Sequence, residues 1–146
     1  MEIFTIGFTK TTAGNFFGRL KANRIERLLD VRLNNRSQLA GFAKRDDLEY
    51  FLRELIGATY EHEPLLVPSQ EILDAYKKKN VMPWKEYEEK FLALMQARKI
   101  ENRLDRAGFE RSTVLLCSED TPDRCHRRLV AEYLAEKWGE IEIIHL

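Results

Sequence analysis

The fold of this 146-residue chain depends most on residues 113–128, which read T-V-L-L-C-S-E-D-T-P-D-R-C-H-R-R. The apolar run V-L-L at 114–116 predicts a buried strand. The polar residues after Cys117 interrupt the strand, and we expect Thr121 to cap a helix that begins at Pro122. A strand end followed by a helix start brings unpaired backbone N–H groups together, which favours anions and thiolates. The stretch therefore predicts a functional site.

Both cysteines of the chain lie in this stretch. Cys117 ends the predicted strand, and Cys125 falls in the first turns of the predicted helix. The same turn carries an acid, an imidazole and two guanidinium groups: Glu119, His126, Arg127 and Arg128. A nucleophile, proton carriers and cations are thus grouped in a few residues, as cysteine-dependent catalysis requires.

The composition describes an ordinary globular chain, long enough for a single domain over residues 1–146. Its formal net charge is +0, from 24 basic and 24 acidic residues. This balance argues against extended nucleic-acid binding but leaves a local basic patch open. No apolar run approaches the roughly 20 residues of a membrane span, so we expect no membrane partner. Two cysteines make no disulfide scaffold, and no secretory signal is visible, which favours the cytoplasm.

Outside this stretch, predicted strands alternate with predicted helices. Further strands are expected at 2–8, 27–32, 58–62 and 140–145. The helices between them should start at caps or prolines, namely Thr11 or Thr12, Asp46 or Asp47, Pro68-Ser69, and Pro83 for a long helix ending near Gly108. This order predicts an α/β fold with three layers, in which helices cover both faces of a mostly parallel sheet of about five strands.

Polar clusters follow four of these strands, at Gly7-Phe8-Thr9, Asp30 with Arg32, His62, and 117–119. In parallel sheets, ligands bind outside the carboxyl ends of the strands. We therefore expect the clusters to meet, with Arg32 close to Cys117 and Glu119. Asp30 and Arg32 flank one residue, so they share a side of the strand. They form either a structural salt bridge or a fixed anion-binding arginine.

Three motifs resemble a known family, the small proteins called domain of unknown function 488. T-I-G-F-T at 5–9 is similar to its T-I-G-H-S, and L-D-V-R at 29–32 followed by Ser37 is similar to its D-V-R…S. L-L-C-S-E at 115–119, then Pro122, then C-H-R at 125–127, is similar to its L-L-C-x-E…P…C-H-R. Phe8 and Thr9 replace the usual His and Ser of the family, and Asn35 stands near a usual Pro. The resemblance implies a fold and a shared pocket, but no established reaction.

These observations give each candidate residue a role. Cys117 would attack the substrate, and Glu119 or His126 would move protons. The expected substrate-binding residues are Thr9, Asp30, Arg32, Ser37 and Arg127. No cofactor is expected. Zinc held by Cys117, Cys125, His126 and His62 is not favoured, because C-x7-C-H is no standard ligand spacing.

Each of these roles has a structural alternative. Cys117 can simply be a small buried residue that ends a strand. His126 falls on the apolar face of its predicted helix, where a histidine is commonly part of the core. The lysine run at 77–79 is expected to be a solvated helix end.

Three functions compete at this stage. The first is cysteine-dependent chemistry on a small anionic or carbonyl substrate, and the second is a non-catalytic module that binds nucleotide or nucleic-acid phosphate. The third is rhodanese-like sulfur transfer, which the acidic residues after Cys117 oppose because a persulfide prefers bare N–H groups. The phosphate-binding hypothesis predicts an anion at the N-terminus of the helix from Pro122.

Overall fold

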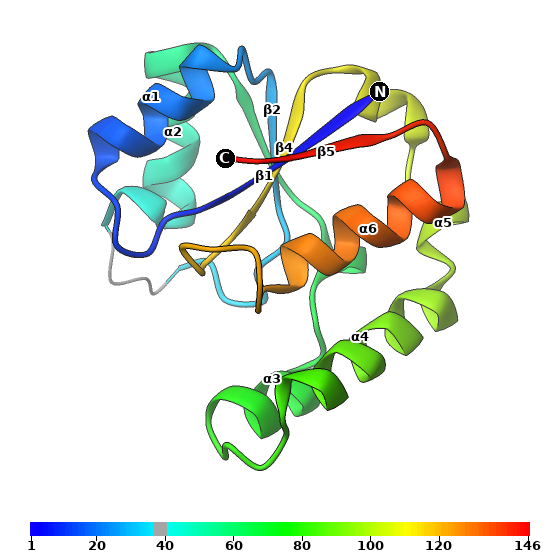
Figure 1. Ribbon diagram of the computed structural model, residues 1–146. Coiled ribbons are helices and arrows are strands. Elements are labelled where there is room, and N and C mark those ends of the chain that lie inside the picture. The colour runs from blue at the N-terminus through cyan, green and yellow to red at the C-terminus, as the bar shows by residue number, and fades with distance from the viewer. Residues whose placement is uncertain (37–40) are drawn as a thin grey trace.

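The computed structural model describes residues 1–36 and 41–146. Its sheet contains β1 (Glu2–Gly7), β2 (Arg27–Asp30), β3 (Thr59–His62), β4 (Thr113–Cys117) and β5 (Glu142–His145). The strand order is β3-β2-β4-β1-β5, and every pairing is parallel (Figure 1). The predicted α/β fold is confirmed, and the sheet, expected to be mostly parallel, is parallel throughout the part of the chain that the structure describes.

Helices cover both faces of this sheet. On one face lie α1 (Ala13–Ala22) and α2 (Arg45–Ile56), and on the other lie α4 (Trp84–Arg98) and α6 (His126–Trp138), as Figure 1 shows. The shorter α3 (Gln70–Lys77) packs against α4, and α5 (Ile100–Arg103) packs against α6. None of the helices in the described residues is long and apolar enough to cross a membrane.

The alternation of side chains along β4 decides which face receives the cysteine. Val114 and Leu116 pack into the core beneath α1 and α2, whereas Leu115 and Cys117 face the core beneath α4 and α6. Successive residues of a strand point to opposite faces, so this division follows directly from the sequence. Cys117 thus lies at the carboxyl edge of the sheet, on the side that α3, α4 and α6 cover.

Two predicted helix starts are confirmed by their capping hydrogen bonds. The Thr12 side chain accepts from the backbone N–H of Asn15 at 3.1 Å, directly before α1. The Ser69 hydroxyl accepts from the backbone N–H of Ile72 at 3.3 Å, directly before α3. Each cap satisfies one of the N–H groups that have no partner inside the helix.

Two other predicted helix boundaries are wrong. Lys44, not Asp46 or Asp47, occupies the N-cap of α2, because the backbone N–H of Arg45 bonds the Asn35 carbonyl and fixes the chain there. The two aspartates instead occupy the first turn of α2, where their negative charge interacts favourably with the helix dipole. The long helix ends at Arg98 rather than near Gly108, because Lys99 adopts a left-handed conformation (φ 53°) that terminates it.

The largest correction concerns the last helix, which begins at His126 rather than Pro122. Residues 118–125 form an irregular loop, and Cys125 takes the extended N-cap position instead of lying in a helical turn. Backbone carbonyl groups of this loop accept hydrogen bonds from other elements. Ser118 accepts from Phe8 and Thr9, which holds the loop against the end of β1 and delays the helix.

Candidate active site at the carboxyl edge of the sheet

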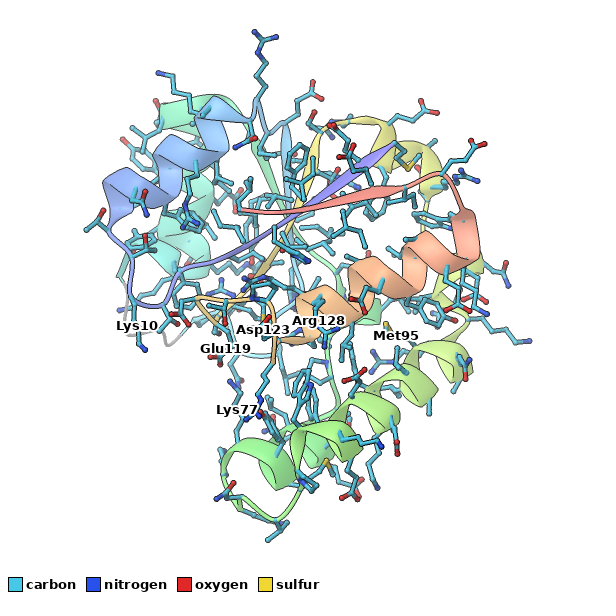
Figure 2. All side chains as sticks on the ribbon, in the orientation of Figure 1. Lys10, Lys77, Met95, Glu119, Asp123 and Arg128 are labelled. Carbon is cyan, nitrogen blue, oxygen red and sulfur yellow. The ribbon has the colours of Figure 1, made fainter. Side chains whose placement is uncertain are left out.

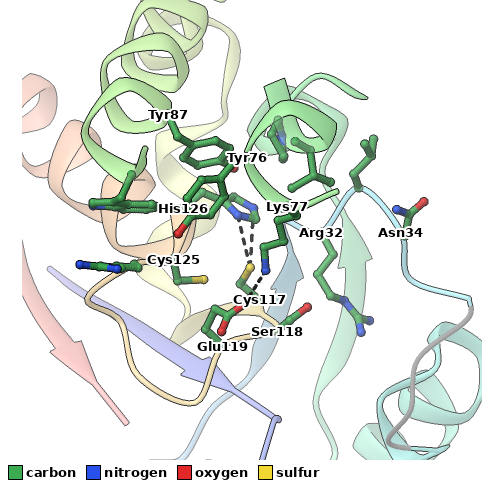
Figure 3. Close-up of a pocket in the computed structure, with 15 residues that line it drawn as sticks. Arg32, Asn34, Tyr76, Lys77, Tyr87, Cys117, Ser118, Glu119, Cys125 and His126 are labelled. Carbon is green, nitrogen blue, oxygen red and sulfur yellow. Dashed lines mark hydrogen bonds and ion pairs between the residues drawn. The ribbon is translucent and has the colours of Figure 1, made fainter. Parts of the chain in front are cut away.

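A pocket of about 260 Å³ opens at the predicted edge of the sheet. Its walls come from the ends of β2 and β4, the loop before α6, and the α3–α4 pair. The lining residues are Arg32, Leu33, Asn34, Pro68, Leu73, Tyr76, Lys77, Trp84, Tyr87, Cys117, Ser118, Glu119, Arg124, Cys125 and His126. Figure 3 shows Tyr76 and Tyr87 on one side of this pocket and Cys117 and Cys125 on the other.

Cys117 contacts the imidazole of His126, which is held in a defined orientation. The Cys117 Sγ lies 3.3 Å from Nδ1 of His126 and 3.9 Å from Nε2 (Figure 3). Nε2 lies 2.5 Å from the carbonyl oxygen of Val31, which can only accept, so Nε2 carries the proton. Nδ1 is therefore the unprotonated nitrogen, and it is the nearer of the two ring nitrogens to the thiol. Burial lowers the pKa of His126, which keeps the ring neutral.

The pKa of Cys117 is lowered, although the thiol is almost completely buried. Burial alone raises the pKa of Cys117, but hydrogen bonds from the Cys125 thiol and the Ser118 backbone N–H stabilise the thiolate. The positive charges of Arg127 and Lys77 act in the same direction. Burial raises the pKa of Cys125 well above its ordinary value. Cys125 therefore stays protonated and donates a hydrogen bond to the sulfur of Cys117.

The same three side chains form a potential metal site. Within the described residues, the ligand atoms of Cys117, Cys125 and His126 lie within 4.8 Å of one another. Sulfur and imidazole ligands suit zinc, and a metal-bound histidine usually donates its other N–H to a carbonyl, as His126 does to Val31. His62 is not the fourth ligand, because its Nε2 bonds the Arg32 carbonyl at 2.8 Å.

Asp30 and Arg32 form a buried ion pair at the end of β2. The Arg32 Nε and Nη2 donate to the two Asp30 carboxylate oxygens, both at 2.9 Å, and the Arg32 backbone N–H adds a third bond at 3.0 Å. The Tyr60 hydroxyl donates to Asp30 Oδ2 at 2.5 Å. Arg32 lines the pocket, whereas Asp30 lies beneath it. Asp30 is therefore a positioning residue for Arg32, because the Arg32 guanidinium donates its hydrogen bonds mainly to this carboxylate.

Arg127 is fully buried below the loop and holds it in place. Its Nη1 donates to the Glu119 backbone carbonyl, and its Nε donates to the Thr5 hydroxyl at 3.3 Å. Gly7 pairs in register with Cys117, and a Cβ at this position would lie 1.6 Å from the Glu119 carbonyl oxygen. Gly7 thus permits the close approach of the loop to β1. Arg127 acts on the site through its charge and this carbonyl, not as a residue lining the pocket.

Glu119 contributes its carboxylate to the rim of the pocket, where it pairs with Lys77. The Lys77 Nζ lies 2.5 Å from Glu119 Oε1, and Figure 2 shows the two side chains meeting between α3 and the loop. Burial lowers the pKa of Lys77, but the hydrogen bond and charge of Glu119, together with the charges of Cys117 and Cys125, outweigh burial and raise the pKa overall. The lysines at 77–79 are exposed at the end of α3, as expected, but Lys77 also lines the pocket and pairs with Glu119.

The structure brings four of the predicted residues to one pocket: Arg32, Cys117, Glu119 and His126. Thr9 is exposed and outside the pocket lining, because its hydroxyl donates to the Ser118 carbonyl at 2.6 Å. Ser37 lies outside the described residues.

Sequence reasoning missed the wall opposite the cysteines. Tyr76 and Lys77 at the end of α3, and Trp84 and Tyr87 at the start of α4, line the pocket.

Comparison with known proteins identifies one family for this chain. No curated protein and no solved structure matches the chain. A family model described as "Domain of unknown function DUF488" matches residues 12–134 of the 146. The match includes β2, the α3–α4 wall and the loop with both cysteines, although it leaves out residues 5–9. The chain therefore belongs to the DUF488 family.

Proposed function

We propose that this protein is a cysteine-dependent enzyme, a transferase or hydrolase acting on a small molecule with a carbonyl-type carbon and an anionic group. One observation carries the proposal. The Cys117 Sγ lines an open pocket while contacting the unprotonated nitrogen of a fixed, neutral imidazole. A thiol beside a base that a third group orients is the arrangement of an activated nucleophile.

The reaction begins when Cys117 attacks the electrophilic carbon of the substrate. The Sγ–carbon bond forms as the π bond of the C=O or C=N group breaks, and its electrons move to the oxygen or nitrogen. The thiol proton passes to Nδ1 of His126, which lies 3.3 Å from Sγ, and from there to the substrate heteroatom. Lys77, at the rim of the pocket, favours the thiolate form of Cys117 through its charge.

The loop after Cys117 argues against the two competing functions, phosphate binding and sulfur transfer. A phosphate site at a helix starting at Pro122 has no helix there, because α6 begins at His126. Sulfur transfer is not favoured because the acidic residues Glu119, Asp120 and Asp123 follow Cys117, whereas a persulfide prefers N–H groups and basic neighbours. Both cysteines are free, and a reducing compartment such as the cytoplasm would keep them available.

The two cysteines should differ in reactivity toward iodoacetamide near neutral pH. We expect Cys117 to be alkylated at least about tenfold faster than Cys125, because its pKa is lowered while that of Cys125 is raised. Peptide mass spectrometry of the folded protein measures both rates. Slow alkylation of both thiols, appearing only on unfolding, would contradict the proposal and leave Cys117 as a core residue.

Replacing Lys77 with methionine should slow the alkylation of Cys117 at neutral pH. Lys77 lowers the pKa of Cys117 through its charge, so its removal raises that pKa and decreases the thiolate fraction. The free energy of unfolding should change by less than about 1 kcal/mol, because the ion pair with Glu119 is partly exposed. Lys78→Met is the matched control, since Lys78 pairs with Asp74 outside the pocket. Equal rates in the two variants would rule out this role for Lys77.

A second candidate function is zinc-dependent hydrolysis, favoured by the clustering of Cys117, Cys125 and His126. Three ligands would leave one position open to the pocket, as in catalytic zinc sites. Metal analysis of protein purified without chelators separates the two candidates. Stoichiometric zinc, lost in parallel in Cys117→Ser, Cys125→Ser and His126→Ala variants, would replace the nucleophile proposal. Metal-free protein with fast Cys117 alkylation supports the nucleophile.

A further inference from the structure

The pocket that holds Cys117 adjoins a second, wider cavity of about 680 Å³. The two cavities share Tyr76, Lys77, Trp84 and Arg124. The outer cavity adds the residues of the α3–α4 connection and the first turn of α4: Asn80, Met82, Pro83 and Lys85. A ligand that occupied both cavities would extend from the thiol at the inner end, past the shared aromatic side chains, to the outer cavity.

Aromatic rings lie where the two cavities meet: Tyr76 and Trp84 line both cavities, and Tyr87 lines the inner one. Trp84 and Tyr87 are stacked, with centroids 5.3 Å apart and planes at 25°. Tyr76 lies 4.9 Å from Tyr87 and 5.6 Å from Trp84 between ring centroids. Burial is complete for Tyr87, but Tyr76 and Trp84 remain partly exposed to the cavities. Partly exposed aromatic faces in a pocket favour a planar ring, because stacking is strongest between flat π systems.

The outer cavity is cationic. Lys77, Lys85 and Arg124 line it, and no carboxylate does. Glu119 neutralises Lys77 from the inner pocket. No hydrogen bond or ion pair engages the Lys85 or Arg124 side chain among residues 1–36 and 41–146. Two unpaired cations at one opening match the charge of a phosphate monoester, which carries about −1.5 to −2 at neutral pH.

We infer that the substrate is a planar heteroaromatic ring joined to a phosphate monoester, for which a mononucleotide is the simplest example. The inference rests on the proposed function, because it places the ring beside Cys117. The ring stacks on Trp84 and Tyr76, its carbonyl-type carbon faces the Cys117 Sγ, and its phosphate binds Lys85 and Arg124. A monoester is favoured over a nucleic-acid strand, whose phosphodiesters each carry a single charge and whose binding needs a more extended basic surface.

Binding of the four common nucleoside 5′-monophosphates to the full chain tests the inference, with calorimetry as the readout. At least one monophosphate should bind about tenfold or more tightly than its nucleoside and than inorganic phosphate. The same ligand should slow iodoacetamide alkylation of Cys117. A short single-stranded oligonucleotide should bind more weakly than that monophosphate.

Two variants test which residues bind the phosphate and which bind the ring. Lys85→Ala combined with Arg124→Ala should reduce affinity for the monophosphate to that of the nucleoside, while nucleoside affinity is unchanged. Trp84→Ala should lower the affinity for both the nucleoside and the monophosphate, roughly 5- to 150-fold, because the stacking contact with the ring is lost. Lys78→Ala combined with Lys79→Ala is the charge-matched control and should change neither, since both lysines lie outside the linings of the two cavities.

Three results would overturn the inference: no binding of any monophosphate, equal affinity for nucleoside and monophosphate, or tighter binding of the oligonucleotide. Repeating the titration with Cys117→Ser separates this inference from the proposed function, because ring and phosphate contacts do not need the thiol. Binding without fast alkylation of Cys117 overturns only the nucleophile, and fast alkylation without binding overturns only the substrate class.

Discussion

Replacing Asp30 with alanine is expected to lower the free energy of unfolding by about 3–5 kcal/mol. The substitution removes three hydrogen bonds to Arg32 and the acceptor of the Tyr60 hydroxyl. Arg32, with only 2% of its surface exposed, would then be a buried cation without a counter-ion. Urea unfolding of the variant and the wild type measures the difference.

Two comparisons show whether the buried charge causes this loss. Glu54→Ala breaks an exposed ion pair with Arg53 and should cost less than about 1 kcal/mol. Adding Arg32→Met to Asp30→Ala should recover much of the stability, because an apolar pair of similar size leaves no unpaired charge. A cost for Asp30→Ala no larger than that for Glu54→Ala would show that the buried ion pair is not important for the fold.

Gly7→Ala is the second substitution with a large expected effect. The new Cβ would lie 1.6 Å from the Glu119 carbonyl oxygen and 2.6 Å from Arg127 Nη1, so the loop must move. Overpacking of this kind costs about 1–3 kcal/mol or more. Because the displaced loop also carries Ser118 and Cys125, alkylation of Cys117 should change together with stability.

Gly18→Ala is a matched control for which we expect the opposite change in stability. Gly18 lies in α1, and no atom within 4 Å would meet its added Cβ. Alanine is a better helix former than glycine by about 1 kcal/mol, so this variant should be more stable than the wild type. If both glycine variants changed stability equally, the close approach of the loop to β1 would not explain the need for Gly7.

Much of the fold was predictable because it depends on local patterns. Alternating strands and helices predict a parallel sheet, and the alternation within 113–117 places Cys117 on one face. The common edge of parallel strands brings Arg32 near Cys117. Helix starts with a serine or threonine cap, such as Thr12 and Ser69, were also predictable.

The remaining features depend on contacts between distant segments. The late start of α6 results from carbonyls that bond Arg127 and the end of β1, which no local propensity encodes. The roles of Lys77 and Trp84 result from the way α3 and α4 reach across the edge of the sheet. Their sequence pattern indicates two helices but not where the helices pack, so the aromatic wall and its cations could not be predicted.

The most direct test of the account is the pKa of Cys117 in the folded protein. In a Cys125→Ser variant, thiolate absorbance in the ultraviolet reports Cys117 alone, and the serine hydroxyl can still donate to the sulfur. We expect a pKa below the value of about 8.5 for a free thiol, and a pKa above that value for Cys125 in Cys117→Ser. A Cys117 pKa at or above about 8.5 would contradict the account, because the thiol would then be an ordinary buried cysteine.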